Sequence, residues 1–407
     1  MQQAARFRIT ADHVDGVYRV GETVRWSVQW AGEGPAPEKI DYVVKRGGLT
    51  EQSKGSLALA QGTGTVEARF EKPGALLLVL QGSRSRGGAV AAPEKIGLSA
   101  PRPQNFDAFW AAKIKELGSV PANPRLERGL SGKPGVVYSK LTMNNIRGTK
   151  IQGHTAQPAG KTTLPALLIV QWAGVYGLPR NWVTDRAADG WLTLNIEAHD
   201  LPFDQPPAFY EEQSKGPLNN YPAIGNDSPE TSYFLRMYLS CYRAAQYLTE
   251  HPDWDGKTLV VMGGSQGGLQ SLMTAGLHPK ITAALASVPA GCDMLGPDVG
   301  RAPGWPMWVF NAQGKDAKKV REASRYFDVA NFTPKIKCPV LIGCGLIDET
   351  CPPEGILAAA NQIKSPKEVV LLPIAGHQNE NGSQAAYEKR CWQDWLPALR
   401  DGKPIPR

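Results

Sequence analysis

Three residues of types that can carry out nucleophilic catalysis follow one another along this chain. Ser265 lies in Gly263-Gly264-Ser265-Gln266-Gly267, which fits the pattern G-x-S-x-G. Asp348 and His377 come after it, in the order serine, acid, histidine. A serine hydroxyl is a weak nucleophile, so it needs a histidine to take its proton and a carboxylate to orient that histidine. The order predicts acyl transfer by a Ser265, His377 and Asp348 triad.

The surroundings of Ser265 favour this interpretation over a chance match to a common pattern. Residues 258–262 form a short, valine-rich apolar run, which is typical of a buried strand. Leucine and methionine residues recur at helical spacing over 269–277. A serine on a tight turn between a strand and a helix is a nucleophile elbow, and Gly263 and Gly267 leave room where side chains would clash. Without these elements, a glycine-rich turn would be the simpler interpretation.

The acid and the histidine are chosen by their places after two later strands. His377 follows the expected strand 368–373 in a loop, whereas the other five histidines precede it along the chain. Asp348 stands just past the expected strand 339–346, and Glu349 beside it is the competing carboxylate. We prefer Asp348 because it is closer to the end of the strand, where open α/β sheets place their sites. Capping of the next helix is the structural alternative for Asp348.

An oxyanion needs two hydrogen-bond donors. The first is expected to be the backbone N–H of Gln266, directly after the nucleophile. The second should come from residues 173–176, after the strand that the pattern predicts over 164–172. We assign this donor to Gly174.

Two long loops are expected to build the substrate site, because such excursions often carry function. They span 199–229 and 294–320. The residues predicted to contact substrate are Trp305, Trp308, Tyr176 and His199. The tryptophans could stack on sugar rings, although tryptophans in such loops more often close a hydrophobic lid.

No metal and no cofactor are expected. Glu197, His199 and Asp200 could suggest a metal, but two carboxylates and one histidine on a loop usually form hydrogen-bonded structure.

The elements from residue 106 onwards predict an α/β domain with a mostly parallel central sheet. A helix is expected over 106–117 and two strands over 136–143 and 151–156, before strands and helices alternate from residue 164. The further strands expected are 191–196, 258–262, 281–288, 339–346 and 368–373, and the helices are 182–188, 231–250, 354–363 and 385–399.

Residues 1–99 are predicted to form a separate immunoglobulin-like β-sandwich. Apolar and polar residues alternate around 24–30, 40–44 and 66–70, glycine-rich turns separate these runs, and 74–80 is a further apolar strand. The region carries no catalytic constellation. We favour a spacer or a wall for the next domain, and a sugar-binding module is the alternative. The proline-containing stretch 97–104 is the linker, so residues 100–407 form the catalytic domain.

Composition narrows the class of protein further. The chain has 407 residues, 42% of them hydrophobic and 20% charged, and a net charge of +7 that is scattered rather than clustered. Binding to nucleic acid or to a membrane is therefore not indicated. Six cysteines show no zinc spacing, and one disulfide is an open alternative. Residues 1–6 contain no signal sequence; we expect a removed leader and a secreted or periplasmic protein. The sequence does not indicate an oligomeric state.

With these residues named, the chain resembles the acetyl xylan esterase and cephalosporin C deacetylase family. The likeness rests on Gly263–Gly268, on Cys338–Leu341 before Gly345–Pro353, on Lys367–Val369 before His377, and on Phe106–Trp110. It covers about residues 101–400. The resemblance implies an α/β-hydrolase fold, the Ser265, His377 and Asp348 triad, and removal of small acyl groups, chiefly acetyl, from sugar hydroxyls.

Three departures from the family pattern put the acyl group and its carrier in doubt. Glu197-Ala198-His199-Asp200 replaces Arg-Gly-Gln, His377-Gln378 replaces His-Glu, and 171–177 differs from a His-Gly-Tyr pattern. The predicted function is a serine esterase acting on acylated plant polysaccharide or oligosaccharide. The alternatives are a feruloyl or glucuronoyl ester hydrolase, a serine peptidase of the same fold, and a carbohydrate-binding protein with an inactive hydrolase domain.

Overall fold

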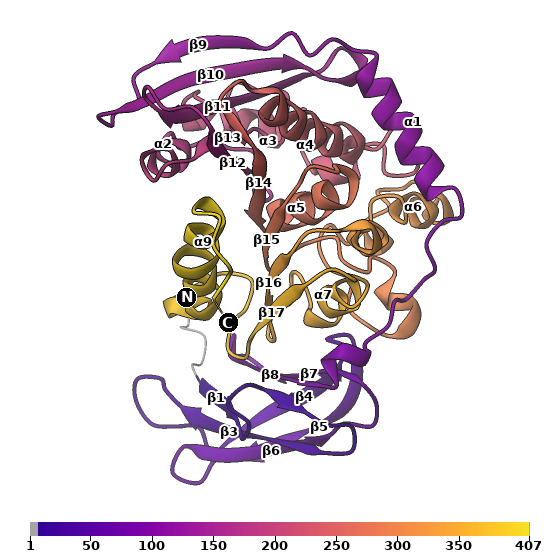
Figure 1. The fold of residues 1–407 in the computed structure, drawn as a ribbon. Coiled ribbons are helices and arrows are strands. Elements are labelled where there is room, and N and C mark those ends of the chain that lie inside the picture. The colour runs from indigo at the N-terminus through magenta and orange to yellow at the C-terminus, as the bar shows by residue number, and fades with distance from the viewer. Residues whose placement is uncertain (1–6, 407) are drawn as a thin grey trace.

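The computed structural model describes residues 7–406, and they form two β-sheet regions of unequal size (Figure 1). The larger is one nine-stranded sheet in the order β17-β16-β15-β14-β12-β13-β11-β10-β9. Neighbours from β17 to β13 pair in parallel, and β13, β11, β10 and β9 pair antiparallel. The strands are β9 (Arg125–Gly129), β10 (Val136–Asn144), β11 (Lys150–Pro158), β12 (Leu164–Ile169), β13 (Leu192–Ile196), β14 (Trp254–Gly264), β15 (Ala283–Ser287), β16 (Val340–Gly345) and β17 (Lys367–Leu372).

Helices cover both faces of the parallel part of this sheet. On one face lie α2 (Asn181–Ala188) and a C-terminal helix that runs through α8 (Ala385–Lys389), a π-helical stretch (Arg390–Trp395) and α9 (Leu396–Arg400); α4 (Tyr233–Glu250), α5 (Gln266–Leu277) and α7 (Pro353–Ala360) lie on the other (Figure 1). Val260 and Val261 belong to the separate cores on these two faces. Burial on both faces explains why these strands read as continuous apolar runs.

The remaining helices lie at the periphery and in the loops. They are α1 (Phe106–Gly118), α3 (Pro207–Lys215) and α6 (Ala317–Ser324). Short 3₁₀ turns are η1 (Pro93–Lys95), η2 (Ile146–Gly148), η3 (Tyr221–Ala223), η4 (Gly296–Val299), η5 (Trp308–Phe310), η6 (Val329–Asn331), η7 (Thr333–Lys335) and η8 (Glu380–Gly382). Among the described residues, no helix is both long and apolar enough to cross a membrane.

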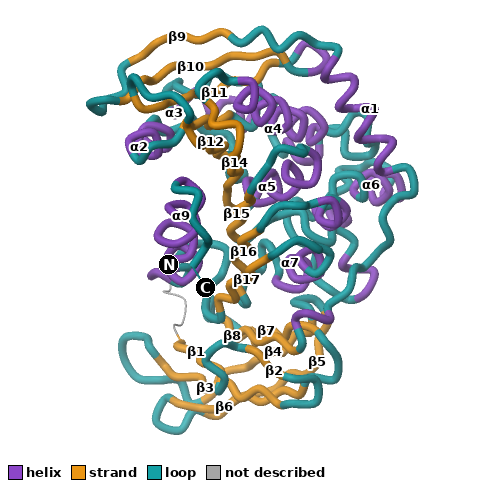
Figure 2. Tube along the Cα trace, in the orientation of Figure 1, coloured by secondary structure: helices purple, strands orange, loops and turns teal. Residues whose placement is uncertain are grey.

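The N-terminal region is all-β, with two sheets that enclose a core of their own around Trp26 (Figure 2). One sheet has the order β1-β3-β6 and the other β2-β8-β7-β4-β5. The strands are β1 (Phe7–Ala11), β2 (Val17–Tyr18), β3 (Thr23–Trp30), β4 (Lys39–Arg46), β5 (Thr50–Ala58), β6 (Thr63–Arg69), β7 (Gly74–Leu80) and β8 (Arg86–Ala91). Trp26 is fully buried, as the alternation of apolar and polar residues in β3 predicts.

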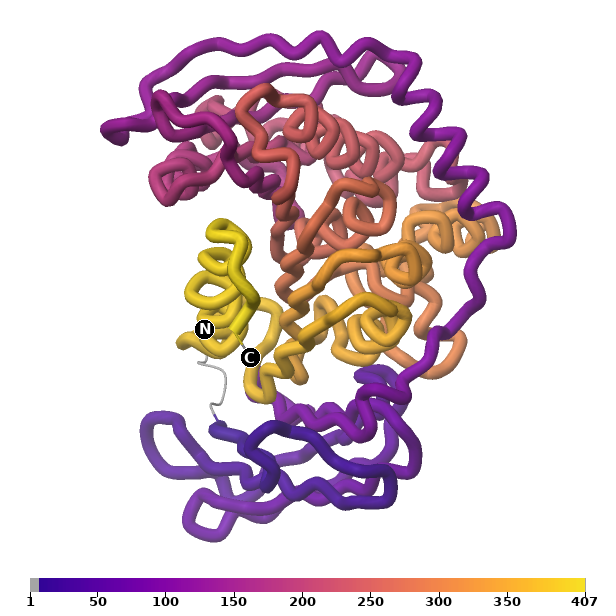
Figure 3. The backbone as a smooth tube through the Cα atoms, in the orientation of Figure 1, coloured from indigo at the N-terminus to yellow at the C-terminus, as the bar shows by residue number. Residues whose placement is uncertain are grey.

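The N-terminal region contacts a part of the large-sheet region that lies far from the linker along the chain. From the N-terminal sheets the chain runs through α1 along one side of the molecule to β9 at the opposite end, then returns across the sheet to β16 and β17, which lie beside β7 and β8 (Figures 1 and 3). Gly88 packs so tightly there that a Cβ would lie 2.5 Å from the Leu346 carbonyl oxygen. The backbone N–H of Ala75 donates to Glu354 Oε1, and Arg86 pairs with Glu349 at 2.8 Å. The N-terminal region therefore contacts the loop that follows β16.

Most of the expected elements are present, with shifts at their ends. The strand expected over 164–172 ends at Ile169, so Trp172 lies in a loop. Strand β9, with every side chain exposed, and helix α3, inside the loop 199–229, were not expected. All six cysteines are free and buried, so the disulfide left open by the sequence does not form in this structure.

Candidate active site

The turn that carries Ser265 is strained. Strand β14 ends at Gly264, helix α5 begins at Gln266, and Ser265 between them has φ 56° and ψ −118°. A residue other than glycine rarely adopts such a backbone, and strain of this kind persists only where the surrounding structure holds it. The Ser265 N–H donates to the Ser287 carbonyl (2.9 Å), and the Ser265 carbonyl accepts from Ala290 N–H (3.0 Å). These bonds tie the turn to the end of the neighbouring strand β15.

Two glycines make this turn sterically feasible. A Cβ on Gly263 would lie 2.7 Å from the Val170 carbonyl oxygen, and one on Gly267 would lie 2.6 Å from the same atom. Both contacts are with backbone, which cannot swing aside as a long side chain can. The two glycines of G-x-S-x-G therefore let strand β12, the turn and helix α5 approach closely, as the sequence predicts.

The structure brings Ser265, His377 and Asp348 into one hydrogen-bonded row. His377 Nε2 lies 2.9 Å from Ser265 Oγ, and His377 Nδ1 lies 2.8 Å from Asp348 Oδ2. These distances fall inside the range expected for a nucleophile, its base and the group that orients the base. The Asp348 side chain is fully buried, and the His377 side chain is 14% exposed. The carboxylate thus meets the imidazole away from water, where their attraction is screened least.

Backbone donors fix the Asp348 carboxylate. Its Oδ1 accepts from the N–H groups of Thr350 and Cys351, both at 2.8 Å, which leaves Oδ2 to face His377. Glu349, the alternative acid, points elsewhere: its carboxylate is half exposed and binds Arg86 of β8. The geometry therefore distinguishes two adjacent acidic residues that the sequence separates only by their distance from the strand end.

The C-terminal helix holds the histidine loop. Gln384, at the start of α8, donates from Nε2 to the carbonyl of His377 (3.1 Å) and lies 3.4 Å from that of Gly376. Its Oε1 accepts from Ser287 Oγ at 3.2 Å. Gln384 thus links the His377 loop to the end of β15, which also holds the Ser265 turn. Sequence reasoning did not identify Gln384, because its role depends on a contact between β15 and α8.

The predicted oxyanion donors have different surroundings. Gln266 is the first residue of α5, where backbone N–H groups lack acceptors within the helix. The Gly174 N–H points to Tyr221 Oη at 3.4 Å, and Tyr221 in turn donates to Gln266 Oε1 at 2.5 Å. Tyr221 therefore connects the two predicted donor segments. The assignment of Gly174 as second donor stays a prediction.

His199 does not reach the substrate side of the site as the sequence led us to expect. It is buried, with Nε2 donating to the Gly174 carbonyl (2.9 Å) and Nδ1 accepting from Tyr233 Oη (2.6 Å). Burial lowers its pKa to about 4, so the ring is neutral at neutral pH. Both ring nitrogens of His199 are therefore bonded to protein groups. Its bond to the Gly174 carbonyl helps to hold the loop 173–176 in place.

Glu197 lies in the same interior region. It is 1% exposed, and burial raises the pKa of its carboxyl well above the usual value, because an ionised carboxylate there would lose its hydration. Asp200 accepts from Lys150 N–H at 2.8 Å, a structural role. The one set of three potential metal ligands found among the described residues is Asp348, Cys351 and His377. A cation there would separate Asp348 from His377, which now bond to each other.

The predicted aromatic contacts are corrected in part. Trp308 is 1% exposed and packs against Phe234 and Phe327, so no sugar ring can stack on it. Trp305 is partly buried and stacks on Phe234, with ring centroids 5.8 Å apart. Both tryptophans thus anchor the loop 294–320 to an aromatic core. This is the alternative in which they close a hydrophobic lid.

Tyr176 stacks on Trp172, with ring centroids 5.2 Å apart, and donates to its carbonyl. Trp172 itself is 48% exposed. The sequence missed this exposed indole because it placed Trp172 inside the strand.

Known proteins resemble this chain over most of its length. The model of the family "Acetyl xylan esterase (AXE1)" matches residues 97–395. Acetyl esterase Axe7A of Xylanibacter ruminicola is 31% identical over 396 residues, which cover 94% of this chain and 88% of that protein. Two solved structures, each covering 73% of this chain and 96% of their own, are acetyl xylan esterase 1 from Thermoanaerobacterium sp. JW/SL YS485 (24% identity, TM-score 0.63) and the acetyl xylan esterase from Paenibacillus sp. R4 (25% identity, TM-score 0.61).

Proposed function

The chain belongs to the acetyl xylan esterase (AXE1) family and is a carbohydrate esterase of the α/β-hydrolase type, and we propose that it removes acetyl groups from plant polysaccharide or oligosaccharide through Ser265, His377 and Asp348. The observation that carries the mechanism is the row of contacts at 2.9 and 2.8 Å from Ser265 Oγ through His377 to Asp348. Family membership carries the substrate class.

In the proposed first half-reaction, Ser265 Oγ attacks the ester carbonyl carbon while His377 Nε2 takes the hydroxyl proton. Asp348 holds the imidazole so that Nε2 faces the serine, and its negative charge stabilises the imidazolium that forms. The Gln266 N–H, with the positive end of α5 behind it, supports the oxyanion, and Gly174 is the proposed second donor. The C–O bond to the sugar then breaks, and His377 returns the proton to the departing sugar oxygen.

The second half-reaction repeats these steps with water. His377 takes a proton from water, whose oxygen attacks the acyl carbon of the Ser265 ester. The tetrahedral species collapses, the carboxylic acid leaves, and the proton returns to Ser265 Oγ. The residues that activate the alcohol thus also activate the water, and no further group is needed to balance either step.

Two further expectations accompany this proposal. We propose that the N-terminal region is an immunoglobulin-like sandwich, because its two antiparallel-rich sheets enclose one core around the buried Trp26. We also propose a secreted or periplasmic location, because a polysaccharide substrate lies outside the cytoplasm. Residues 1–6, on which the leader expectation was based, lie outside the described residues.

The test compares the wild type with Ser265→Ala on p-nitrophenyl acetate and acetylated xylan. We expect the variant to lose at least about 10³-fold in kcat on both, because the nucleophile is removed. Ser119→Ala, at an exposed serine after α1, is the matched control and should keep full activity. Equal rates for Ser265→Ala and the wild type would refute the mechanism.

Side-by-side assays on feruloylated arabinoxylan, a glucuronoyl ester and a dipeptide amide decide the substrate. If kcat/KM is higher on any of these than on acetylated xylan, the proposed substrate is wrong. The assignment of Ser265 as the nucleophile would not be affected.

A further inference from the structure

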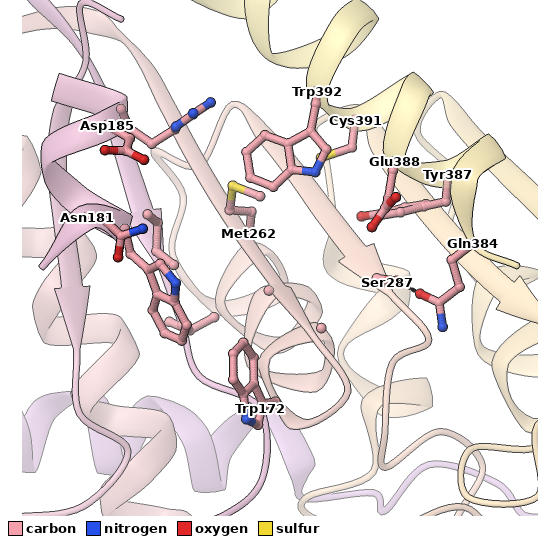
Figure 4. A pocket seen from close by; sticks show the side chains of 16 residues that line it. Trp172, Asn181, Asp185, Met262, Ser287, Gln384, Tyr387, Glu388, Cys391 and Trp392 are labelled. Atoms are coloured by element: carbon pink, nitrogen blue, oxygen red, sulfur yellow. Dashed lines mark hydrogen bonds between the residues drawn. The ribbon is translucent and has the colours of Figure 1, made fainter. Parts of the chain in front are cut away.

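A cavity of about 450 Å³ opens on the α2 face of the large sheet, between α2 and the C-terminal helix (Figure 4). Its size lies within the roughly 300–1,000 Å³ typical of small-molecule sites. Met262 of β14 lies between the side chains contributed by α2 and those contributed by the C-terminal helix (Figure 4). The cavity therefore lies between two of the helices that cover this face of the sheet.

Exposed indoles mark two ends of this cavity. Trp172 and Trp392 lie at opposite ends (Figure 4), with 48% and 43% of their surfaces exposed. Trp182 packs edge-on against Trp172, with ring centroids 4.8 Å apart. The guanidinium of Arg186 lies over the Trp392 ring, 5.0 Å from its centre, in a cation–π contact. Large apolar side chains that stay this exposed within one concave site indicate a ligand that covers them.

Polar groups flank the indoles on both sides. Asn181 and Asp185 project from α2, and Gln384 and Glu388 come from the start of the C-terminal helix (Figure 4). Asp185 pairs with Lys133 at 2.8 Å, and Glu388 accepts from Asn379 Nδ2 at 2.8 Å. With Arg186 as the one cation of the lining, the cavity carries no excess of positive charge that would select an anionic ligand. Flat apolar faces bordered by hydrogen-bonding groups suit a neutral pyranose ring, whose C–H face is apolar and whose edge carries hydroxyls.

The cavity borders the proposed reacting groups at three points. Gly264 lines it and directly precedes Ser265. Gln384 lines it and donates to the carbonyl of His377. Trp172 lines it and lies two residues before Gly174 in the same loop. A chain bound here would therefore lie beside the proposed acyl-transfer centre.

We propose that this cavity binds neutral, unacetylated pyranose units of the polysaccharide, stacked on Trp392 and Trp172, while an acetylated unit of the same chain occupies the Ser265 site. The inference rests on the proposed function for the identity of the chain. It makes Trp392 a determinant of oligosaccharide affinity with no part in acyl transfer, because Trp392 contacts neither Ser265 nor His377 in the described hydrogen-bond network.

The experiment measures the affinity of the full-length protein for unsubstituted xylohexaose by calorimetry, so no ester bond has to be cleaved. Trp392→Ala should weaken binding roughly tenfold, as expected when an aromatic anchor is truncated, and Trp392→Phe should restore most of it. Both variants should keep kcat/KM on p-nitrophenyl acetate within about twofold of wild type, because the elbow and its histidine are untouched.

Trp30→Ala is the control, because Trp30 is a half-buried indole beside a separate hollow in the N-terminal region. It should bind xylohexaose as the wild type does. Loss of binding in Trp30→Ala instead would place the sugar on the N-terminal region and overturn the inference. Absence of binding by the wild type, or unchanged binding by Trp392→Ala, would also overturn it.

The proposed function is tested independently. If Trp392-dependent binding is present but acetylated xylan is not deacetylated, the cavity assignment stands and the proposed function fails. If deacetylation is present without Trp392-dependent binding, only the cavity assignment fails.

Discussion

Replacing Gly88 by alanine should lower esterase activity, although Gly88 belongs to the N-terminal region. A Cβ there would lie 2.5 Å from the Leu346 carbonyl oxygen and 2.7 Å from its carbonyl carbon, whereas ordinary contact begins at 3.4 Å. One of the two backbones must therefore retreat by about 0.9 Å. Leu346 begins the loop that carries Asp348 two residues later, so displacement of this loop moves the carboxylate away from His377.

The size of the effect follows from the geometry of the Asp348–His377 contact. A displacement of about 1 Å at a reacting group can cost roughly 10²-fold in rate. The strain is shared between β8 and the loop, so we expect kcat/KM on p-nitrophenyl acetate to fall by about 10- to 100-fold. Overpacking of this kind should also cost about 1–3 kcal/mol in unfolding free energy. The assay must therefore run well below the unfolding midpoint of the variant.

Gly97→Ala is the matched control for this experiment. A Cβ added at Gly97 would meet no atom within 4 Å, and the backbone there has no positive φ, so alanine should be accepted without loss of activity. The reasoning is refuted if folded Gly88→Ala has the kcat/KM of the wild type. That result would mean that β8 alone absorbs the strain and that the N-terminal region does not position Asp348.

Further outcomes follow from the site and from its buried ionisable groups. Asp348→Asn should lower kcat by about 10⁴-fold, whereas Glu349→Gln should change it less than about twofold because that side chain faces Arg86; equal effects in rate assays would contradict the assignment of the acid. His199 has a folded pKa of about 4, below the 6.5 of the unfolded chain, so the unfolded state binds more protons between these values. The unfolding free energy should therefore fall as pH drops from 6.5 towards 4, and urea titrations should show a shallower fall for His199→Gln. Glu197 has a raised folded pKa, so the unfolded chain releases its proton first as pH rises above 4.5, and stability declines. Glu197→Gln should consequently unfold at a higher urea concentration than wild type at pH 8 and at a similar one at pH 4; the reverse order would show that Glu197 is ionised in the folded protein.

The sequence predicted most of the large sheet because its strands are buried on both faces. Val260 and Val261 belong to cores on opposite sides of the sheet, so the run 258–262 contains almost no polar residue and is easy to recognise. Strand β9 lies at the open edge with its residues exposed, and it carries no such pattern. The substrate contact predicted for Trp308 failed because residue type alone does not show whether a side chain in a loop is buried. Trp308 is buried and Trp172 is exposed, although both are tryptophans in loops.

By itself, the sequence determined the order of Ser265, Asp348 and His377, the glycines that permit the elbow, and the strands that precede each residue. These are local properties, set by steric limits on the backbone and by which short runs must be buried. Only the tertiary structure decided that Asp348 rather than Glu349 meets His377, that His199 turns inward, and that Trp392 comes to lie opposite Trp172. Each of these depends on surfaces contributed by elements far apart in the chain, which come together only when strands and helices pack.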